Sequence, residues 1–165
     1  MEGVKRHLHS QADLHALEEI PEGMPWGKWV HYTVPVLFIL LLAYLVSYRG
    51  LEVSLGLLGF WFIAHGILSA LGAALAKSHP FTIASAFLAS PFTALHPAIA
   101  AGWVAAYVEY RFNTPKVKDF STITQLNSYK DFQNNSVTHL LLVTAYTNIG
   151  STIATLIAVP YVIAL

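Results

Sequence analysis

Four histidines lie in or beside apolar segments of the sequence: His65, His79, His96 and His139. Imidazole binds both metals and haem, and a bis-histidine haem site needs two such rings that face each other across helices. No two of the four are three or four residues apart, and no H-E-x-x-H motif is present. We therefore expect no metal or cofactor and assign these rings to hydrogen bonds between helices. A haem-binding anchor and a polar pathway are the alternatives.

A second candidate site is the segment SPFTALHP, residues 90–97, which interrupts a long apolar run. Transporters and channels use broken helices to direct the ends of half-helices at a ligand. In that reading Thr93 and His96 line a cavity, and His65 and Asn148 face it from other helices. The simpler alternative is a plug that the surrounding side chains satisfy, because irregular backbone at membrane depth needs protein or water around it.

Charged residues are scarce between Trp29 and Tyr110. Glu52 falls at the expected start of one helix, and Glu109 and Arg111 fall at the expected end of another. Ionisable residues within a membrane are candidates for function. These three lie near the expected membrane interfaces, where long side chains reach water, so we interpret them as interface charges.

The composition is that of an integral membrane protein. Of the 165 residues, 55% are hydrophobic and 11% are charged, whereas soluble domains carry about 25% charged residues. The formal net charge is zero, which argues against a nucleic-acid partner. No cysteine is present, which excludes disulfides and thiolate metal sites.

The apolar pattern predicts an all-α, multi-pass helix bundle. Full spans are expected at about residues 29–48, 51–76 and 137 to the end, and small residues in the second span predict close helix packing. Residues 1–28 are polar and are expected to form a helix or linker that follows an upstream soluble domain. Residues 29–165 then form the transmembrane domain.

Prolines divide the run between the second and last spans. Pro80 suits a helix start, Pro91 disfavours helix at the residue before it, and Pro97 can open a new helix. The expected products are half-helices at about 80–90 and 97–111. Eleven helical residues rise only about 16 Å, half of the roughly 30 Å hydrocarbon core. The pair therefore forms either one broken span or a re-entrant hairpin that returns to the face it left.

Counting positive charges chooses between the two topologies. With the N-terminus inside, a hairpin places eight Lys and Arg residues inside and one outside, whereas a broken span places four inside and five outside. Positive residues concentrate on the cytoplasmic side of membrane proteins. The expected architecture is therefore three full spans plus a proline-broken re-entrant hairpin.

Several motifs resemble the C-terminal membrane region of the TraB/PrgY family, over roughly residues 10–160. They are HPFT, SPFTALHP, AAGWVAAYVEYRFNTPKVKDF and NNSVTHLLLVTAYTNIGS. The family is named for bacterial proteins that shut down a peptide sex pheromone. One departure is His96, which stands where the family often has Asn.

The resemblance implies a soluble N-terminal domain related to metal-dependent peptidases, followed by this membrane part. The G-x-x-H motifs of that soluble domain are absent here, so no catalytic residue is carried over and no enzyme activity is expected of this chain. The implied function is to anchor, and to orient or gate, a soluble peptide-directed domain in the cell membrane of a prokaryote. The alternatives are a small channel or transporter with its site at the half-helix junction, and a haem-binding anchor. Expected partners are the lipid bilayer, the upstream TraB soluble domain and further copies of the chain.

Overall fold

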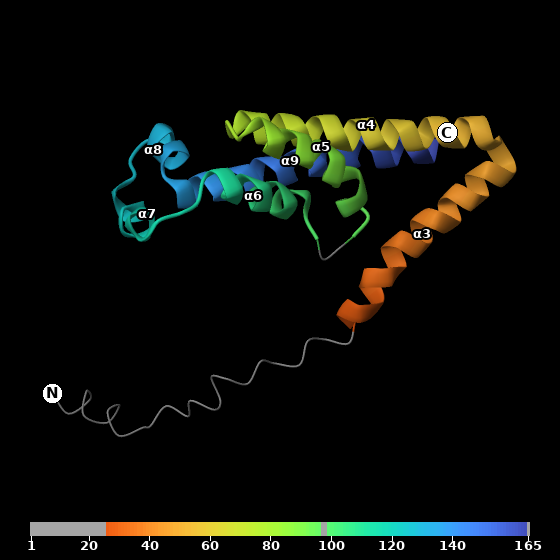
Figure 1. Ribbon diagram of the computed structural model, residues 1–165. Coiled ribbons are helices and arrows are strands. Elements are labelled where there is room, and N and C mark those ends of the chain that lie inside the picture. The colour runs from red at the N-terminus through yellow and green to blue at the C-terminus, as the bar shows by residue number, and fades with distance from the viewer. Residues whose placement is uncertain (1–25, 97–98, 165) are drawn as a thin grey trace, which may run out of the picture.

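All regular structure in the described part of the chain is helical. The computed structural model describes residues 26–96 and 99–164. Its elements are α3 (Trp26–Arg49), α4 (Leu51–Leu75), α5 (Pro80–Thr93), α6 (Ala101–Phe112), α7 (Val117–Ser121), the 3₁₀ helix η1 (Ile123–Gln125), α8 (Tyr129–Asn134) and α9 (Ser136–Ala164) (Figure 1). The predicted all-α class is confirmed. The helix predicted within residues 1–25, and Pro97, lie outside the described residues.

Three helices are long and apolar enough to cross a membrane. They are α3, α4 and α9, with 24, 25 and 29 residues. At about 1.5 Å per residue, each exceeds the roughly 30 Å hydrocarbon core. The three predicted spans therefore appear as helices whose bounds agree with the prediction to within a few residues. Gly50, with φ of 86°, makes the turn between α3 and α4 in a conformation that favours glycine.

Helices α4 and α9 pack along each other and form the spine of the bundle (Figure 1). Two glycines let their backbones approach. A Cβ on Gly72 would collide with the carbonyl of Tyr146, and a Cβ on Gly150 would collide with the carbonyl of Leu68. Close approach through small residues is the usual way that helices associate in lipid, and the small-residue pattern of the second span predicted it.

Helices α5 and α6 run in opposite directions and pack against α4 and α9. The ring of His79, just before α5, stacks on the ring of Phe112 at the end of α6, with centroids 3.8 Å apart. The chain thus leaves one end of the bundle in α5 and returns to it in α6. The short helices α7 and α8 lie at that same end (Figure 1).

The predicted bounds of the half-helices need correction. Helix α5 continues through Pro91 to Thr93, so Pro91 does not break it, and α6 begins at Ala101 instead of residue 97. Pro91 lies in the last turn, where its missing N–H costs one helical hydrogen bond. The carbonyl of Pro91 accepts a hydrogen bond from the indole N–H of Trp61, at 3.1 Å. Pro80 stands at the first position of α5, as predicted.

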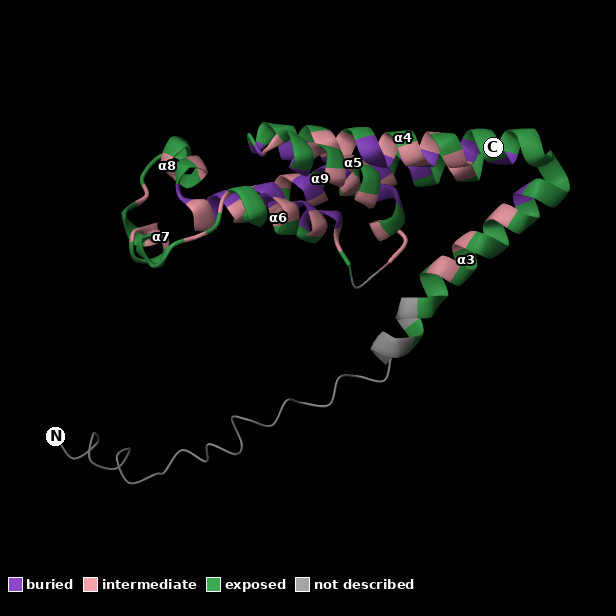
Figure 2. Ribbon diagram, in the orientation of Figure 1, coloured by how far each residue is buried: buried purple, intermediate pink, exposed green. Residues whose placement is uncertain are grey.

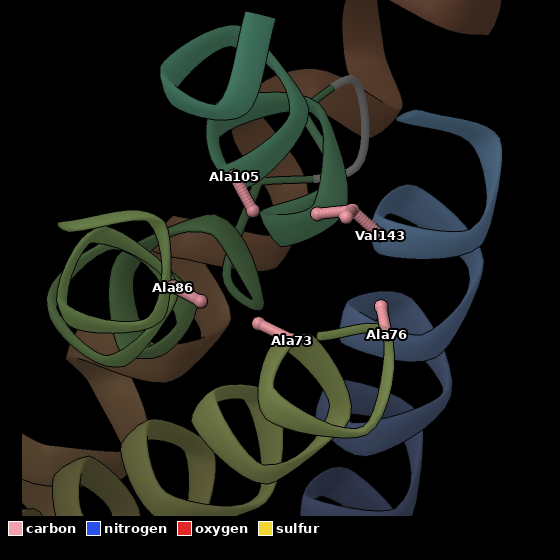
Figure 3. Close-up of a cluster of buried hydrophobic side chains, with 5 residues drawn as sticks. All are labelled: Ala73, Ala76, Ala86, Ala105 and Val143. Atoms are coloured by element: carbon pink, nitrogen blue, oxygen red, sulfur yellow. The ribbon is translucent and has the colours of Figure 1, made fainter. Parts of the chain in front are cut away.

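The apolar core is built from small side chains. Ala73, Ala76, Ala86, Ala105 and Val143 are buried together where α4, α5, α6 and α9 meet (Figure 3). Much of the outer surface is exposed and apolar, and α3 is exposed along most of its length (Figure 2). The bundle is therefore held by close backbone packing around a thin core.

Candidate functional site

Glu109 is the centre of a buried polar cluster, which we call the Glu109 layer: His79, Thr82, Glu109 and His139. Its Oε2 accepts hydrogen bonds from the backbone N–H of His79 at 2.8 Å and the hydroxyl of Thr82 at 2.7 Å. Its Oε1 lies 3.1 Å from Nε2 of His139. Glu109 is 4% exposed and His139 is 5% exposed. The carboxylate joins the start of α5, the end of α6 and the first turns of α9.

Sequence reasoning placed Glu109 at a membrane interface and missed this role. The missed signal is the spacing of Ala101, Ala105 and Glu109, four residues apart on one face of α6. All three are buried. A stripe of small residues marks a packed helix face, and a carboxylate on that stripe must point into the bundle. The other two interface charges, Glu52 and Arg111, are exposed.

A second cluster, the hydroxyl layer, comprises Ser69, Ser90 and Ser151. The hydroxyl oxygens of Ser69 and Ser90 are 2.5 Å apart, and Ser90 donates to Ser151 at 3.1 Å. These bonds link α4, α5 and α9. Each residue supplies a small polar group that hydrogen-bonds across helices, as is common in membrane bundles.

His65 lies beside the hydroxyl layer. Its Nδ1 is 3.0 Å from the carbonyl of Trp61, and its Nε2 is 3.1 Å from the hydroxyl of Thr155. A carbonyl oxygen only accepts, so Nδ1 must carry a proton. The ring is fully buried and lies against the indole of Trp61, with centroids 4.0 Å apart. His65 therefore links α4 to α9 by hydrogen bonding, as its sequence position predicted.

An open cleft of about 330 Å³ lies at the junction of α5 and α6, and we call it the junction cleft. Thr93, Asn148, Ser151, Thr152 and Thr155 supply its polar lining. Asn148 Oδ1 accepts the N–H of Gly102 at 2.7 Å, which fixes the start of α6 against α9. A Cβ on Gly102 would collide with the carbonyl of Thr144, so only glycine permits this approach.

The four residues predicted to share a cavity are only partly brought together. Thr93 and Asn148 both line the junction cleft. His65 does not line the cleft but hydrogen-bonds to Thr155, which does. His96 does not line the cleft either. The hydroxyl of Thr93 donates to the carbonyls of Ala89 and Ser90 within its own helix.

The hydroxyls that line the cleft donate mostly to backbone carbonyls of their own helices. Thr152 donates to the carbonyl of Asn148 at 2.9 Å, and Thr93 donates within its own helix, whereas the Thr155 hydroxyl lies 3.1 Å from both the carbonyl of Ser151 and Nε2 of His65. A hydroxyl has one hydrogen to donate and two lone pairs. These side chains therefore present acceptor oxygens to the cleft.

The Glu109 layer and the hydroxyl layer are separated by apolar side chains. Along α9, His139, Val143, Thr147 and Ser151 follow one another at four-residue spacing, and Val143 is completely buried. Ala73, Ala86 and Ala105 surround Val143 from α4, α5 and α6 (Figure 3). The two polar layers thus stand on either side of a dry layer.

No group of three or more histidine, aspartate or glutamate side chains is placed to hold a metal ion within residues 26–96 and 99–164. The four histidines of the apolar segments lie at different places in the bundle. His65 joins α4 to α9 beside the hydroxyl layer, His79 and His139 belong to the Glu109 layer, and His96 lies between α5 and α6.

Comparison with known proteins identifies the family. The chain matches the TraB family protein, C-terminal domain, over residues 26–165. An uncharacterized protein of Methanocaldococcus jannaschii is 32% identical over 130 residues, which cover 76% of this chain and 33% of the relative. The chain thus spans about a third of that relative's length. No solved structure matches. The family expected from the motifs is confirmed, and this chain belongs to the TraB family as a C-terminal domain.

Proposed function

We propose that this chain is the membrane-embedded domain of a longer TraB family protein. In this proposal α3, α4 and α9 cross the bilayer, and α5 and α6 form a re-entrant hairpin. The domain anchors and orients a soluble, peptide-directed domain in the cell membrane of a prokaryote. The relative in Methanocaldococcus jannaschii, of which the match covers 33%, supports both a longer chain and a prokaryotic source.

The hairpin proposal depends on one observation, the contact between the two ends of the α5–α6 pair. Glu109 near the end of α6 accepts the backbone N–H of His79, which precedes α5. Helices of 14 and 12 residues rise about 21 Å and about 18 Å, so neither crosses a roughly 30 Å core alone. Two short helices that begin and end at one level favour entry and exit on the same face.

Charge supports the same topology. Arg49 lies at the α3–α4 turn, one end of the bundle. The Lys and Arg residues that come after Arg49 in the sequence lie toward the other end, where α7 and α8 are: Lys77, Arg111, Lys116, Lys118 and Lys130. The excess of positive residues at one end assigns that end to the cytoplasm.

Cysteine labelling tests the hairpin. The chain has no cysteine, so single substitutions give clean reporters. Lys77→Cys and Thr114→Cys are exposed positions that flank the α5–α6 pair, and Arg49→Cys reports the opposite end. We expect a membrane-impermeant maleimide to label residues 77 and 114 from the same side of sealed vesicles, and residue 49 from the other. Labelling of 77 and 114 from opposite sides would establish a broken span instead.

The anchoring proposal has a separate test. An antibody raised against residues 113–135 should detect the natural gene product in membranes washed with alkaline carbonate. We expect a band clearly larger than the 18.1 kDa of this chain. A band of that size would show that no soluble domain shares the chain, and extraction by carbonate would show that the protein does not span the membrane.

The junction cleft supports a second candidate function, a small channel or transporter. The observation that favours it is the lining of a cleft of about 330 Å³ by Thr93 and Asn148 at the place where α5 and α6 meet. Liposomes carrying the protein should then conduct small polar solutes such as sodium, ammonium or glycerol. Asn148→Ala should abolish that flux, whereas Thr114→Ala, outside the cleft, should not. Flux equal to that of empty liposomes would exclude this function.

A further inference from the structure

Glu109 accepts hydrogen bonds only from groups that suit an ionised carboxylate. The backbone N–H of His79 can only donate, and it reaches Oε2 at 2.8 Å. The hydroxyl of Thr82 donates to the same oxygen at 2.7 Å. Hydrogen bonds from such donors stabilise the charged form of a carboxyl group. This arrangement is therefore suited to an ionised carboxylate inside the bundle.

His139 supplies the third donor in its neutral form. With a proton on Nε2, the ring donates to Oε1 of Glu109 at 3.1 Å. Its Nδ1 is then an acceptor, and it is buried without a hydrogen-bond partner. His139 itself is 5% exposed. An empty lone pair therefore lies on the far side of the ring from the carboxylate, in a position to take a proton.

The other charged and titratable groups near this end do not neutralise Glu109. The one ion pair of the described residues joins Glu109 to His139. His79 Nδ1 accepts from the N–H of Phe81. The cations of this end are all exposed: Lys77, Arg111, Lys116, Lys118 and Lys130. The guanidinium of Arg111 lies over the ring of Tyr107. Asp119 and Asp131, on α7 and α8, accept hydrogen bonds from nearby backbone N–H groups.

We propose that Glu109 and His139 form a binding site for one proton. In the charged state the carboxylate is ionised and His139 is neutral with its proton on Nε2, so the pair carries one negative charge. Proton uptake occurs at Nδ1 of His139. The Nε2 proton stays in the hydrogen bond to Oε1 or transfers to that oxygen, and in both cases the pair becomes neutral overall.

Proton uptake has a structural consequence for the hairpin. Hydrogen bonds to an ionised acceptor are roughly twice as strong as those between neutral groups. Transfer of the proton to Oε1 makes the carboxyl group neutral and therefore weakens the bonds from His79 and Thr82, which fasten the start of α5 to the end of α6. The site thus couples the charge state of the bundle to the closure of the α5–α6 hairpin. This inference goes beyond the anchoring function and does not depend on it.

Nitrogen-15 NMR of histidine-labelled protein in liposomes tests the site. The signal of His139 is assigned by its loss in His139→Gln. We expect its Nδ1 to change from unprotonated to protonated as the pH of the sample is lowered. An Nδ1 that stays unprotonated throughout, or stays protonated throughout, would overturn the proposal.

Matched variants separate the site from a general effect of pH. Glu109→Gln removes the negative charge beside the ring, so proton uptake at His139 should become less favourable than in the unsubstituted protein. Glu52→Gln is the same substitution at an exposed position and should leave the titration unchanged. Thr82→Val removes one donor to the carboxylate and should move uptake to higher pH. A titration that is the same in the protein and in the Glu109→Gln and Thr82→Val variants would contradict a shared proton site.

Discussion

The Glu109 layer and the junction cleft are both polar, yet they are built in opposite ways. In the Glu109 layer an acidic side chain of α6 is enclosed, and the hydrogen bonds to it come from the start of α5 and from α9. In the junction cleft uncharged side chains line an open space, and their hydroxyls mostly donate within their own helices. The first region therefore depends on tertiary contacts, whereas the second keeps its side chains available to a ligand.

The dry layer between them explains how both can exist in one small bundle. Val143 and four alanines are buried with no polar partner among them. Small side chains let the helix backbones approach, so a thin apolar layer separates the cleft from the carboxylate. Substitutions in each region should consequently have different effects, largest where a buried charge loses its surroundings.

Glu109→Ala should have the largest effect on stability. It leaves the N–H of His79, the hydroxyl of Thr82 and the ring of His139 without their shared acceptor. Removing one partner of a buried, hydrogen-bonded pair costs about 3–5 kcal/mol. Thermal unfolding in detergent measures the loss, with Glu52→Ala as the exposed control. Equal melting temperatures for the two variants would show that the Glu109 layer does not hold the bundle together.

Gly102→Ala should have the next largest effect, at the boundary of the junction cleft. The added methyl group meets the carbonyl of Thr144 and the side chain of Asn148, so α6 must move away from α9. Overpacking of this kind costs about 1–3 kcal/mol. The same substitution at Gly56, where a Cβ meets nothing within 4 Å, is the matched control. It should be neutral or slightly stabilising, because alanine favours helix.

Ser90→Ala should cost less, because it removes hydrogen bonds without exposing a charge. The Ser90 hydroxyl bonds to those of Ser69 and Ser151, and all three groups are uncharged. A net loss of about 1 kcal/mol is expected. A loss as large as that of Glu109→Ala, measured by the same unfolding assay, would mean that the two polar layers do not differ as described.

Asp131→Asn lies outside both polar layers and should have the smallest effect. Hydrogen bonding with the Ser128 side chain, followed by the backbone N–H groups of Asn127 and Ser128, lowers the pKa of the Asp131 carboxyl. A lowered folded-state pKa contributes stability above the unfolded value, which is lost as the pH falls through the folded value. When the pH is lowered, the variant should therefore lose slightly less helical signal from α8 than the unsubstituted protein does, as measured by circular dichroism. An equal pH response of the two proteins would show that the Asp131 carboxylate does not stabilise the start of α8 in this way.

The sequence predicted the fold class, the long helices and the family because these depend on local patterns. Uninterrupted apolar runs define α4 and α9 without reference to the rest of the chain. Pro91 was misjudged as a break because the cost of a proline depends on its place in the helix, and here it falls in the last turn.

The hydrogen-bond partners of Glu109 could not be predicted from the sequence for a physical reason. They come from segments as far apart as His79 and His139, and only the packing of α5, α6 and α9 together brings them into contact. By contrast, Thr93 and Asn148 both line the junction cleft, at the break between the half-helices where a cavity was expected, and the role of that cavity stays a prediction.

The most direct test of the hairpin is the distance between spin labels on Lys77→Cys and Thr114→Cys in liposomes. The stacked rings of His79 and Phe112, 3.8 Å apart, predict that the two labels lie close together at one end of the bundle. A single span built from the 14 and 12 residues of α5 and α6 would instead separate its ends by about 39 Å. A short distance is expected, and a distance near that larger value would contradict a hairpin closed by Glu109.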